Sequence, residues 1–482
     1  MDYQSTVLVT LIVYKILLIS IGIWSNKKTK STDDFFIGGR TLGPWVAAIS
    51  AAASASSAWS LLGMSGAAYF LGLSAIWIVP SVILGYCFNW LWVAPRIQKA
   101  ATANKSVTLT DFITQGAQSH KKSIIWLCTV CIVISFAFYI AAQFQAAGNM
   151  FSETFAMEAN TSIVLGTMII LVYTLLGGFW AVSITDTLQG ILMVVTAVLL
   201  PIAAIFTIGG FDNLWQQMQL VYDPVQLSWF GEYQGINIIA FLLGTLGIGL
   251  ANPGQPHVVN RLMALRDEKA VRQGKYIGIG WSIVIFVSML IVGWSARVLL
   301  SSDIHQEQAM ISLAQQLFPP VLAGVVVAAT LSAIMSTADS QLLVAASAVS
   351  YDISSSSQKS NLLRSKLTVA TMCFISMMIA IWAPQDIFSR VLFAWNALGA
   401  AFGPIVIILL LGRTCRPAFL FSAILIGFTS TVLFSWLPSA PGDVIERVVP
   451  FCLAFACAWL GSYTGDDIQQ NNYARRHKSQ IQ

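Results

Sequence analysis

The chain has 482 residues, of which 56% are hydrophobic and 10% are charged, and its formal net charge is +5. A soluble globular protein carries about a quarter charged residues, so this chain lacks the polar surface that water requires. The composition excludes a soluble enzyme, a nucleic-acid-binding protein and a disordered chain. It predicts a polytopic protein of the lipid bilayer.

A helix needs about 20 mainly apolar residues to span the bilayer, and thirteen stretches of the sequence meet this requirement. We therefore expect an all-α integral membrane protein with thirteen transmembrane helices. The predicted spans are residues 5–25, 43–68, 71–95, 123–149, 161–178, 181–208, 236–259, 276–300, 320–350, 365–384, 387–412, 416–437 and 446–464.

The loops between these spans alternate in charge. Most of the 26 Lys and Arg residues fall in one set of loops, beginning with Lys27, Lys28 and Lys30, whereas the intervening loops carry mainly acidic residues. Cytoplasmic loops retain Lys and Arg. We therefore expect a multi-pass membrane protein with its N-terminus outside and its C-terminus in the cytoplasm.

Nearly all of the 21 acidic residues lie in loops or at the ends of predicted spans, and the two exceptions are Asp186 and Asp339. An ionisable side chain in hydrocarbon costs at least ~2.5 kcal/mol, so it is a functional hypothesis by default. Both acids lie beside hydroxyl side chains, and we expect no embedded Lys or Arg near them. Hard cations prefer carboxylate, hydroxyl and carbonyl oxygens, which favours an ion site. The alternative is a pair of hydrogen bonds between packed helices.

The ninth span carries a stripe of small and hydroxyl residues. Residues at i, i+3, i+4 and i+7 share one helix face. Small residues at such spacing are usually helix contacts, but two adjacent hydroxyls and a nearby carboxylate favour ion binding. The stripe consists of Ala333, Ser336, Thr337 and Ser340.

Two spans contain interruptions that a simple membrane helix would not have. The second span includes a small and polar run at 51–59, and the seventh includes glycines and prolines at 244–257. Free backbone carbonyls at membrane depth are tolerated where they line a cavity. Because the interruptions are five spans apart, they predict a five-plus-five inverted repeat with a binding site at two broken helices.

This pattern divides the chain into five parts. We expect two repeats of five helices, flanked by peripheral segments and separated by an extracellular loop. The parts are a leader helix with a cytoplasmic loop (1–42), the first repeat (43–208), the loop (209–235), the second repeat (236–412), and two peripheral helices with a cytoplasmic tail (413–482).

Several aromatic and polar residues in the spans are candidates for a solute cavity, although each taken alone is more often a packing residue. They are Trp59, Tyr139, Trp395 and Asn396. His257 follows a proline near the end of the seventh span, and we interpret it as a hydrogen-bonding residue at a helix end.

Six stretches give the chain a resemblance to the sodium:solute symporter family, and most closely to its bacterial sodium/proline symporter branch. The similarity runs through nearly the whole chain and includes the thirteen-helix count. The stretches are DFFIGGRTLG (34–43), residues 50–67, LLGGFWAVSITDTLQGILM (175–193), GQPHVVNRLM (254–263), LSAIMSTADSQLLVAASAVS (331–350) and AWNALGAAFGP (394–404).

The resemblance implies a sodium site between the second and ninth spans. Its ligands would be the backbone carbonyls of Ala53, Ser56 and Ala333 and the hydroxyls of Ser336 and Thr337. Some relatives have a second site, which would here involve Asp186, Asp339 and Ser340 and would take sodium or a proton. Sodium is the ion that we expect the protein to bind. The resemblance also implies a location in the plasma (inner) membrane.

For the substrate, the chain both keeps and departs from the pattern of the proline symporters it resembles. Ala55 stands where they usually have an aspartate, and Ile248 and Asn252 stand where they have a tryptophan and a tyrosine. These departures put proline itself in question and leave an amino acid or a related solute as the expectation. The expected substrate-binding residues are Ser57, Trp59, Tyr139, Asn252, Gln255 and Pro256.

We therefore expect a sodium-coupled symporter that imports a small organic solute, with proline as the first candidate, by alternating access. We expect no enzymatic activity and no nucleic-acid partner, and the oligomeric state is left open. The alternatives are a proton-coupled carrier, a sodium symporter for another solute such as a small carboxylate, and a transporter-like sensory or channel module.

Overall fold

The computed structural model describes residues 3–26, 37–117, 119–176, 179–300, 304–353, 358–383 and 386–464. Within these ranges the chain is almost entirely helical. Two short strands, β1 (Thr414–Cys415) and β2 (Ser462–Tyr463), pair antiparallel beside the C-terminal helices. The basic residues Lys27, Lys28 and Lys30, which entered the topology prediction, lie outside the described residues, as does the tail 465–482.

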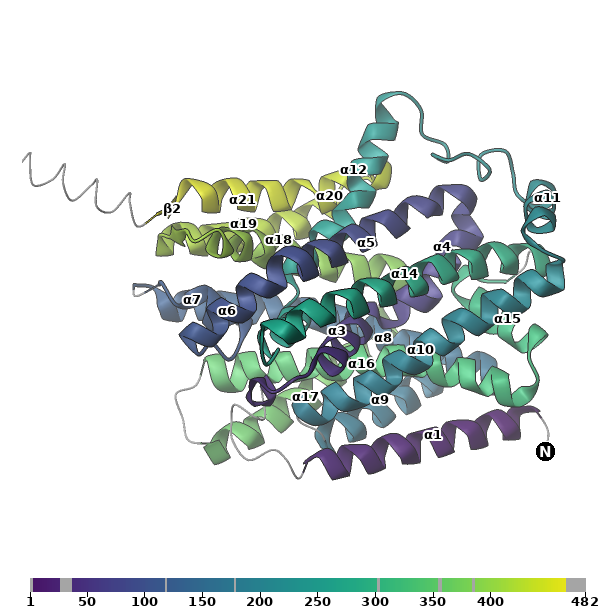
Figure 1. Ribbon diagram of the computed structural model, residues 1–482, viewed down its shortest axis with the longest axis horizontal. Helices are drawn as coiled ribbons and strands as arrows, with labels where there is room; N and C mark the ends of the chain where they lie inside the picture. Colours follow the sequence, from purple (N-terminus) through teal and green to yellow (C-terminus); the bar gives the residue numbers. More distant parts are fainter. Residues whose placement is uncertain are drawn as a thin grey trace, which may run out of the picture.

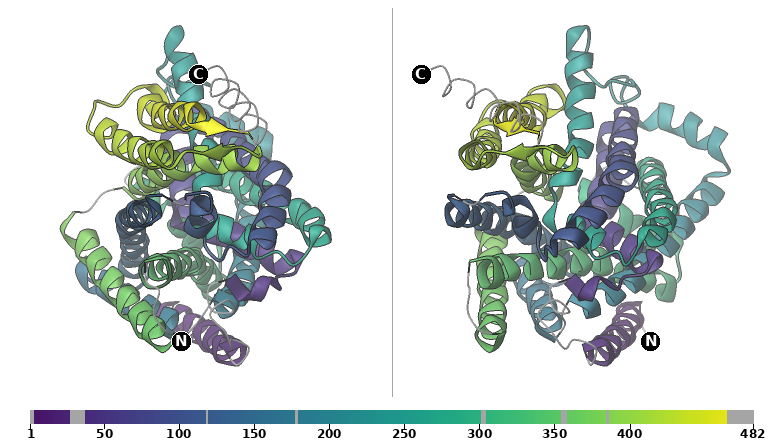
Figure 2. Two further views of the ribbon diagram at one scale, coloured as in Figure 1. Left: turned by 90° about the vertical axis from the view of Figure 1, so that its left-hand side faces the viewer. Right: turned by 60° about the vertical axis from the view of Figure 1, so that its left-hand side comes forward.

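The helices run roughly side by side along the long axis of the molecule (Figure 1). Helix α1 (Tyr3–Asn26) lies at one edge and the C-terminal helices lie at the opposite edge (Figure 2). The start of α1 and the loop around residues 209–235 mark one end of the bundle, which we call the loop face. Helices α6 and α7 and the two strands mark the other end, which we call the opposite face.

The first half of the core begins with a broken helix. Helix α3 and helix α4 are joined by a π-helical turn, and Gly72, with φ 63°, reverses the chain. A β-carbon there would lie 2.3 Å from the carbonyl oxygen of Gln226, so only glycine fits. The elements of this half are η1 (Gly38–Arg40), α3 (Pro44–Ala58), η2 (Trp59–Gly63), α4 (Met64–Leu71), η3 (Gly72–Trp77), α5 (Ile78–Phe88), η4 (Asn89–Val93), α6 (Ala94–Asn104), α7 (Leu109–Thr114), α8 (Lys121–Phe155), α9 (Ala159–Leu176) and α10 (Phe179–Ile208).

The second half also begins with a broken helix, in which Asn252–Gly254 form a single 3₁₀ turn. Pro256 starts the helix after the break, where its missing N–H costs nothing. The elements of this half, after the loop helix α11 (Phe211–Val221), are α12 (Ile236–Leu250), η5 (Asn252–Gly254), α13 (Pro256–Met263), α14 (Glu268–Leu299), η6 (Gln306–Gln308), α15 (Ala309–Leu317), α16 (Pro320–Ser347), η7 (Ala348–Asp352), α17 (Gln358–Trp382) and α18 (Ile387–Leu410).

The peripheral C-terminal helices pack on α18. They are α19 (Pro417–Phe434), η8 (Pro441–Asp443), α20 (Val444–Arg447) and α21 (Val449–Leu460). Each predicted span therefore contains at least one helix. Among the described residues, ten stretches are long and apolar enough to cross a membrane, and one of them, Pro44–Asn104, folds back at Gly72. The all-α membrane fold is confirmed, whereas the count of thirteen spans stays a prediction.

The break in the second half is held in place by close packing against α18. A β-carbon on Gly399 would lie 2.2 Å from the β-carbon of Ala251, directly before η5. A β-carbon on Gly254 would lie 2.7 Å from the carbonyl oxygen of Leu398. The backbones of η5 and α18 therefore lie so close together that a side chain larger than that of glycine would not fit at Gly254 or Gly399. This contact fixes the position of η5 against the core.

We predict that Gly399→Ala destabilises the protein, because the added methyl group overpacks the contact at a cost of about 1–3 kcal/mol. The measurement is the thermal unfolding of the purified protein in detergent. Gly280→Ala is the matched control, since no atom lies within 4 Å of its β-carbon position. Equal melting temperatures for both variants would contradict the packing account.

Candidate functional site

The break in α3 occurs at Ser57. Its backbone angles are φ 50° and ψ −175°, a region that residues with a β-carbon rarely occupy. Neighbouring amides find side-chain partners: Ala58 N donates to Gln143 Oε1 of α8 at 2.9 Å, and Trp59 N donates to the Ser57 hydroxyl at 3.1 Å. Such partners are needed because an unpaired buried amide is costly.

Directly before this break, α3 meets α16 through a group of oxygen atoms. The Ser336 hydroxyl donates to the carbonyl of Ala53 at 3.1 Å and to that of Ala333 at 3.2 Å. The Thr337 hydroxyl donates to the carbonyl of Ser54 at 2.9 Å. The carbonyl of Ser56, one turn further along α3, accepts from the Ser60 hydroxyl. All of these residues are buried.

This oxygen group suits a sodium ion. Carbonyl and hydroxyl oxygens are hard, neutral ligands. A hydroxyl hydrogen can rotate away from a carbonyl and leave both oxygens free for a cation. The structure brings Ala53, Ala333 and Ser336 into direct contact, as the predicted ligand set requires, and it places Thr337 against the neighbouring carbonyl of Ser54.

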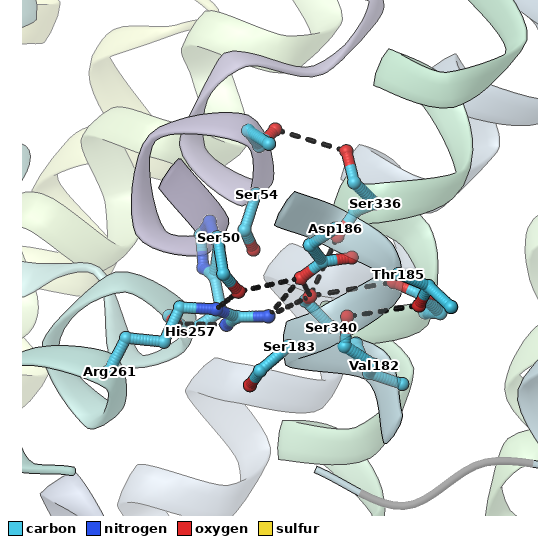
Figure 3. Close-up of polar contacts among 12 residues, drawn as sticks. Ser50, Ser54, Val182, Ser183, Thr185, Asp186, His257, Arg261, Ser336 and Ser340 are labelled. Carbon is cyan, nitrogen blue, oxygen red and sulfur yellow. Dashed lines mark hydrogen bonds and ion pairs between the residues drawn. The ribbon is translucent and has the colours of Figure 1, made fainter. Parts of the chain in front are cut away.

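A second buried polar cluster surrounds Asp186 of α10 (Figure 3). Its Oδ2 accepts from Arg261 Nη2 at 2.6 Å, from the Ser50 hydroxyl at 2.9 Å and from the Ser340 hydroxyl at 3.4 Å. The same guanidinium also donates to Ser50, to Ser340 and to the carbonyl of His257. The cluster therefore joins α3, α10, α13 and α16.

The expectation that no basic side chain lies near Asp186 is wrong. Arg261, assigned to a loop from sequence, is buried on α13, and it forms an ion pair with this carboxylate. The physical reason is that α13 continues inside the bundle after the break. A proline at the first position of a helix predicts that the helix continues from Pro256 through Arg261, and this is the signal in the sequence that could have placed Arg261 inside the bundle.

Asp339 lies next to Ser340 on α16, and its Oδ1 accepts from the Ser340 hydroxyl at 3.4 Å. Its Oδ2, like Oδ1 of Asp186, has no hydrogen-bond partner among the described residues. Lys15 of α1 reaches the same region, where its ammonium contacts the sulfur of Met335, one helical turn before Asp339. Asp186, Asp339 and Ser340 thus lie in one buried region, in which Arg261 pairs with Asp186 and Lys15 contacts Met335.

An enclosed cavity lies between the two broken helices. Trp59, Tyr139 and Asn252 line it as predicted, whereas Ser57, Gln255 and Pro256 are not among its lining residues. The space open to the centre of a water molecule is about 20 Å³, enough for about one water, so the walls must move apart to admit an organic solute. The lining residues are Ala55, Trp59, Val82, Tyr86, Tyr139, Ile248, Asn252, Phe286, Val391, Leu392 and Trp395.

Comparison with known proteins identifies the family of this chain. The model of the sodium:solute symporter family matches residues 35–427. The chain belongs to this family. The symporter is 31% identical over 459 residues to the high-affinity proline transporter PutP of Bacillus subtilis, covering 92% of this chain and 94% of the relative. It is 32% identical over 456 residues to the sodium/proline symporter of Escherichia coli, covering 91% and 90%.

Solved structures support the inverted-repeat transporter fold. A sodium-coupled sialic acid symporter in a substrate-bound outward-open state matches with a TM-score of 0.79 at 18% identity, covering 96% of this chain and 100% of that chain. Mhp1, a nucleobase-cation-symport-1 family transporter, matches with a TM-score of 0.56 at 12% identity, covering 89% and 95%. The symporter is a transporter and not an enzyme, and sodium is its coupling ion.

The departures of this symporter from the proline pattern, Ala55, Ile248 and Asn252, all lie on the cavity wall. Asn252 is held by Asn89, whose amide donates to Asn252 Oδ1 at 2.7 Å. Gln255 stabilises the break, because its side-chain amide donates hydrogen bonds to the backbone carbonyls of Ala251 and Trp395.

On the loop face, a wider cavity of about 480 Å³ approaches the enclosed one, and both are lined by Ile248. Phe388 lines the wider cavity, and its ring packs 5.6 Å from that of Trp59. Glu307 holds the start of α18 there, because its Oε1 accepts from the amides of Ile387 at 2.6 Å and Phe388 at 3.3 Å. Trp59 and Phe388 thus separate the two cavities.

The sequence did not reveal several wall residues, the pairing of Arg261 with Asp186, or the contact of Lys15 with Met335. Tyr86, Phe286 and Val391 come from helices whose sequence shows no local signal, since only packing of distant spans brings them together. Lys15 lies within the first predicted span, where one charge among apolar residues gave no pairing information.

We predict that Arg261→Gln and Asp186→Asn each destabilise the symporter strongly, because breaking a buried ion pair leaves an uncompensated charge at about 3–5 kcal/mol. The double variant should recover part of this loss, since both charges are then removed. Thermal unfolding of the purified variants provides the measurement.

The control is Arg266→Gln, which breaks an ion pair with Asp267. The side chain of Arg266 is 52% exposed and that of Asp267 is 50% exposed. An exposed pair contributes at most about 1 kcal/mol, so the melting temperature should barely move. Strictly additive losses in the Asp186 and Arg261 double variant would show that the two side chains do not act as a pair.

Proposed function

We propose that this symporter imports an amino acid with sodium, and that L-proline is the first candidate. The observation that carries this proposal is the position of the oxygen group. Ala53 of the α3–α16 contact lies on the same broken segment as Trp59, which lines the solute cavity. A cation bound there would order the segment that the solute contacts.

The cavity wall offers few polar groups and a large apolar surface. Asn252, Tyr86 and Tyr139 contribute polar atoms, and aliphatic and aromatic side chains form the remainder. Such a composition fits a small solute with an apolar body and a polar end. The lining residues include no carboxylate to pair with an ammonium group, so amine recognition would rest on hydroxyl, amide and aromatic groups, together with Ser57, Gln255 and Pro256 at the breaks.

Coupling follows from the same geometry. Sodium entering from outside would bridge Ala53, Ser56, Ala333, Ser336 and Thr337, and the two halves would then move to open the cytoplasmic side. One sodium ion moving down ~100 mV supplies about 2.3 kcal/mol. Since 1.36 kcal/mol is a factor of ten, this corresponds to roughly fifty-fold accumulation of the solute.

We further propose that Asp186, Asp339 and Ser340 form a second cation site, for sodium or for a proton. The unpartnered carboxylate oxygens of both acids support this proposal. Arg261 and Lys15 oppose the binding of another cation there, because each brings a positive charge to the cluster. A second ion would therefore compete with the protein's own cations.

We also propose that the loop face is extracellular and that the opposite face is cytoplasmic. The distribution of Lys and Arg supports this orientation. Helix α1 begins on the loop face, and β2 lies at the opposite face, as required by an N-terminus outside and a C-terminus inside. The membrane would be the plasma (inner) membrane.

A second candidate, a sodium symporter for a small carboxylate, is favoured by one observation. The three departures from the proline pattern all fall on the cavity wall, at Ala55, Ile248 and Asn252. With alanine in place of an acidic residue at position 55, the wall has no negative charge there to repel an anionic solute. It also has no negative charge there to attract an ammonium group.

The test of the proposed function is the uptake of labelled L-proline into proteoliposomes with an inward sodium gradient and a matched potassium control. Saturable, sodium-dependent uptake supports it. If proline fails, a sodium-driven screen of other amino acids and small carboxylates decides between the two candidates. Uptake that ignores sodium and follows a pH gradient would contradict sodium coupling.

We predict that Ser336→Ala and Thr337→Ala each raise the half-saturating sodium concentration about tenfold or more, because a group that hydrogen-bonds or ligates a charge contributes about 1.5–3 kcal/mol. Sodium-dependent uptake at fixed solute concentration provides the measurement. Ser347→Ala is the matched control, since this buried hydroxyl of α16 has, among the residues with described positions, the carbonyl of Val344 in its own helix as its hydrogen-bond partner. Unchanged sodium affinity in both site variants would refute the proposed ligand set.

A further inference from the structure

His257 has an environment that packing alone does not explain. Its side chain is fully buried, and neither ring nitrogen has a hydrogen-bond partner in the part of the chain that the structure describes. The expected hydrogen bond at a helix end is therefore wrong, since only the His257 carbonyl is engaged, by Arg261. An imidazole has one donor and one acceptor, and leaving them unpaired in the interior is costly.

Three aromatic rings surround this imidazole edge to face. The ring centroids of Phe136, Tyr139 and Trp395 lie 5.5, 6.3 and 6.3 Å from that of His257, with interplanar angles of 74°, 86° and 71°. These rings fix the orientation of the imidazole without occupying either nitrogen. The arrangement preserves two free polar atoms in an otherwise apolar enclosure.

Two of these rings, Tyr139 and Trp395, also line the solute cavity. His257 therefore lies directly behind the cavity wall. The Trp395 indole donates to the carbonyl of Ile248 at 2.9 Å, and the Tyr139 hydroxyl reaches that of Ser57 at 3.5 Å. Both contacts tie the wall to the broken helices, so movement of the breaks would also move the wall.

The direction from the cavity to His257 leads away from the loop face. Asn252 lines the cavity, and the chain passes His257 before reaching Leu265, whose carbonyl accepts from Gln98 of α6 at 3.3 Å. Helix α6 lies at the opposite face (Figure 1). Tyr139 and Trp395 line the cavity and also contact His257, so they lie between the cavity and this imidazole.

We propose that His257 is a second solute contact, which the solute reaches when Tyr139 and Trp395 part on the way to the opposite face. One ring nitrogen donates a hydrogen bond to the carboxylate of the amino acid, and the other is available to accept one from its ammonium group. This inference rests on the proposed function, because it requires a solute with a carboxylate. His257 is then a second position for the solute, outside the enclosed cavity, from which the solute is released toward the opposite face.

The test compares the two faces separately, in right-side-out and inside-out membrane vesicles, with labelled L-proline as the probe. His257→Phe keeps a ring and removes both polar atoms, and His257→Gln keeps a donor. We expect His257→Phe to raise the half-saturating proline concentration about tenfold at the opposite face and much less at the loop face. His257→Gln should recover most of the affinity, and sodium affinity should not change.

Two controls separate this role from a structural one. Thr196→Val removes another buried polar atom without a described partner, on α10, from a residue that does not line the cavity, and it should leave both faces unaffected. Prolinamide lacks the carboxylate but keeps the amine, so its competition should weaken less than that of proline when His257 is replaced by Phe. His257→Leu gives the same expectation if the phenylalanine ring is not accommodated.

Equal half-saturating concentrations at the opposite face for the wild type and His257→Phe would overturn the inference. An equal loss at both faces with a lowered melting temperature would also overturn it, since it would indicate a structural role. These outcomes differ from failure of the proposed function, in which the wild type itself transports no amino acid under a sodium gradient.

Discussion

The interruption of α3 at Ser57 is the constraint on which the rest of the structure depends. A continuous helix would satisfy its own carbonyls and present only side chains to α16. The break instead leaves amides that need Gln143 and Ser57 as partners, and it exposes Trp59 to the cavity. The oxygens of Ala53 and Ser336 meet directly before the break. In the proposed function, cation binding and solute binding would therefore act on one short backbone segment, and this shared segment would couple them.

The charged core beside this segment restrains the halves relative to one another. Arg261, on the helix after the second break, reaches Asp186 of the first half and the hydroxyls of Ser50 and Ser340. The pair therefore links both broken helices through a single guanidinium. If α13 moves relative to α3 and α10, the hydrogen bonds of Arg261 must either break or move together with its partners. A buried charge pair of this kind gives the interface a defined geometry more than it gives net stability.

The sequence predicted the features that have a local signature. The interruptions at 51–59 and 244–257, the hydroxyl stripe of α16 and the buried acids are visible as residue types at fixed spacing, and the structure brings them to one region. Features that depend on how distant spans pack had no such signature. The apolar run that defines the seventh span ends before Arg261, so hydropathy predicts a loop there, although helix α13 continues through this residue. Tyr86, Phe286 and Val391 became wall residues only when three separate helices converged.

We propose that sodium bridges α3 and α16 and orders the broken segment. Hydrogen–deuterium exchange of the purified symporter, measured by mass spectrometry in sodium chloride and in equimolar potassium chloride, tests this proposal without any assumption about the solute. We expect slower exchange in sodium for the backbone amides around Ser56–Trp59 and around Ala333–Thr337, and no change in the peripheral helices α19 and α21. Identical exchange of both segments in sodium and potassium would contradict it.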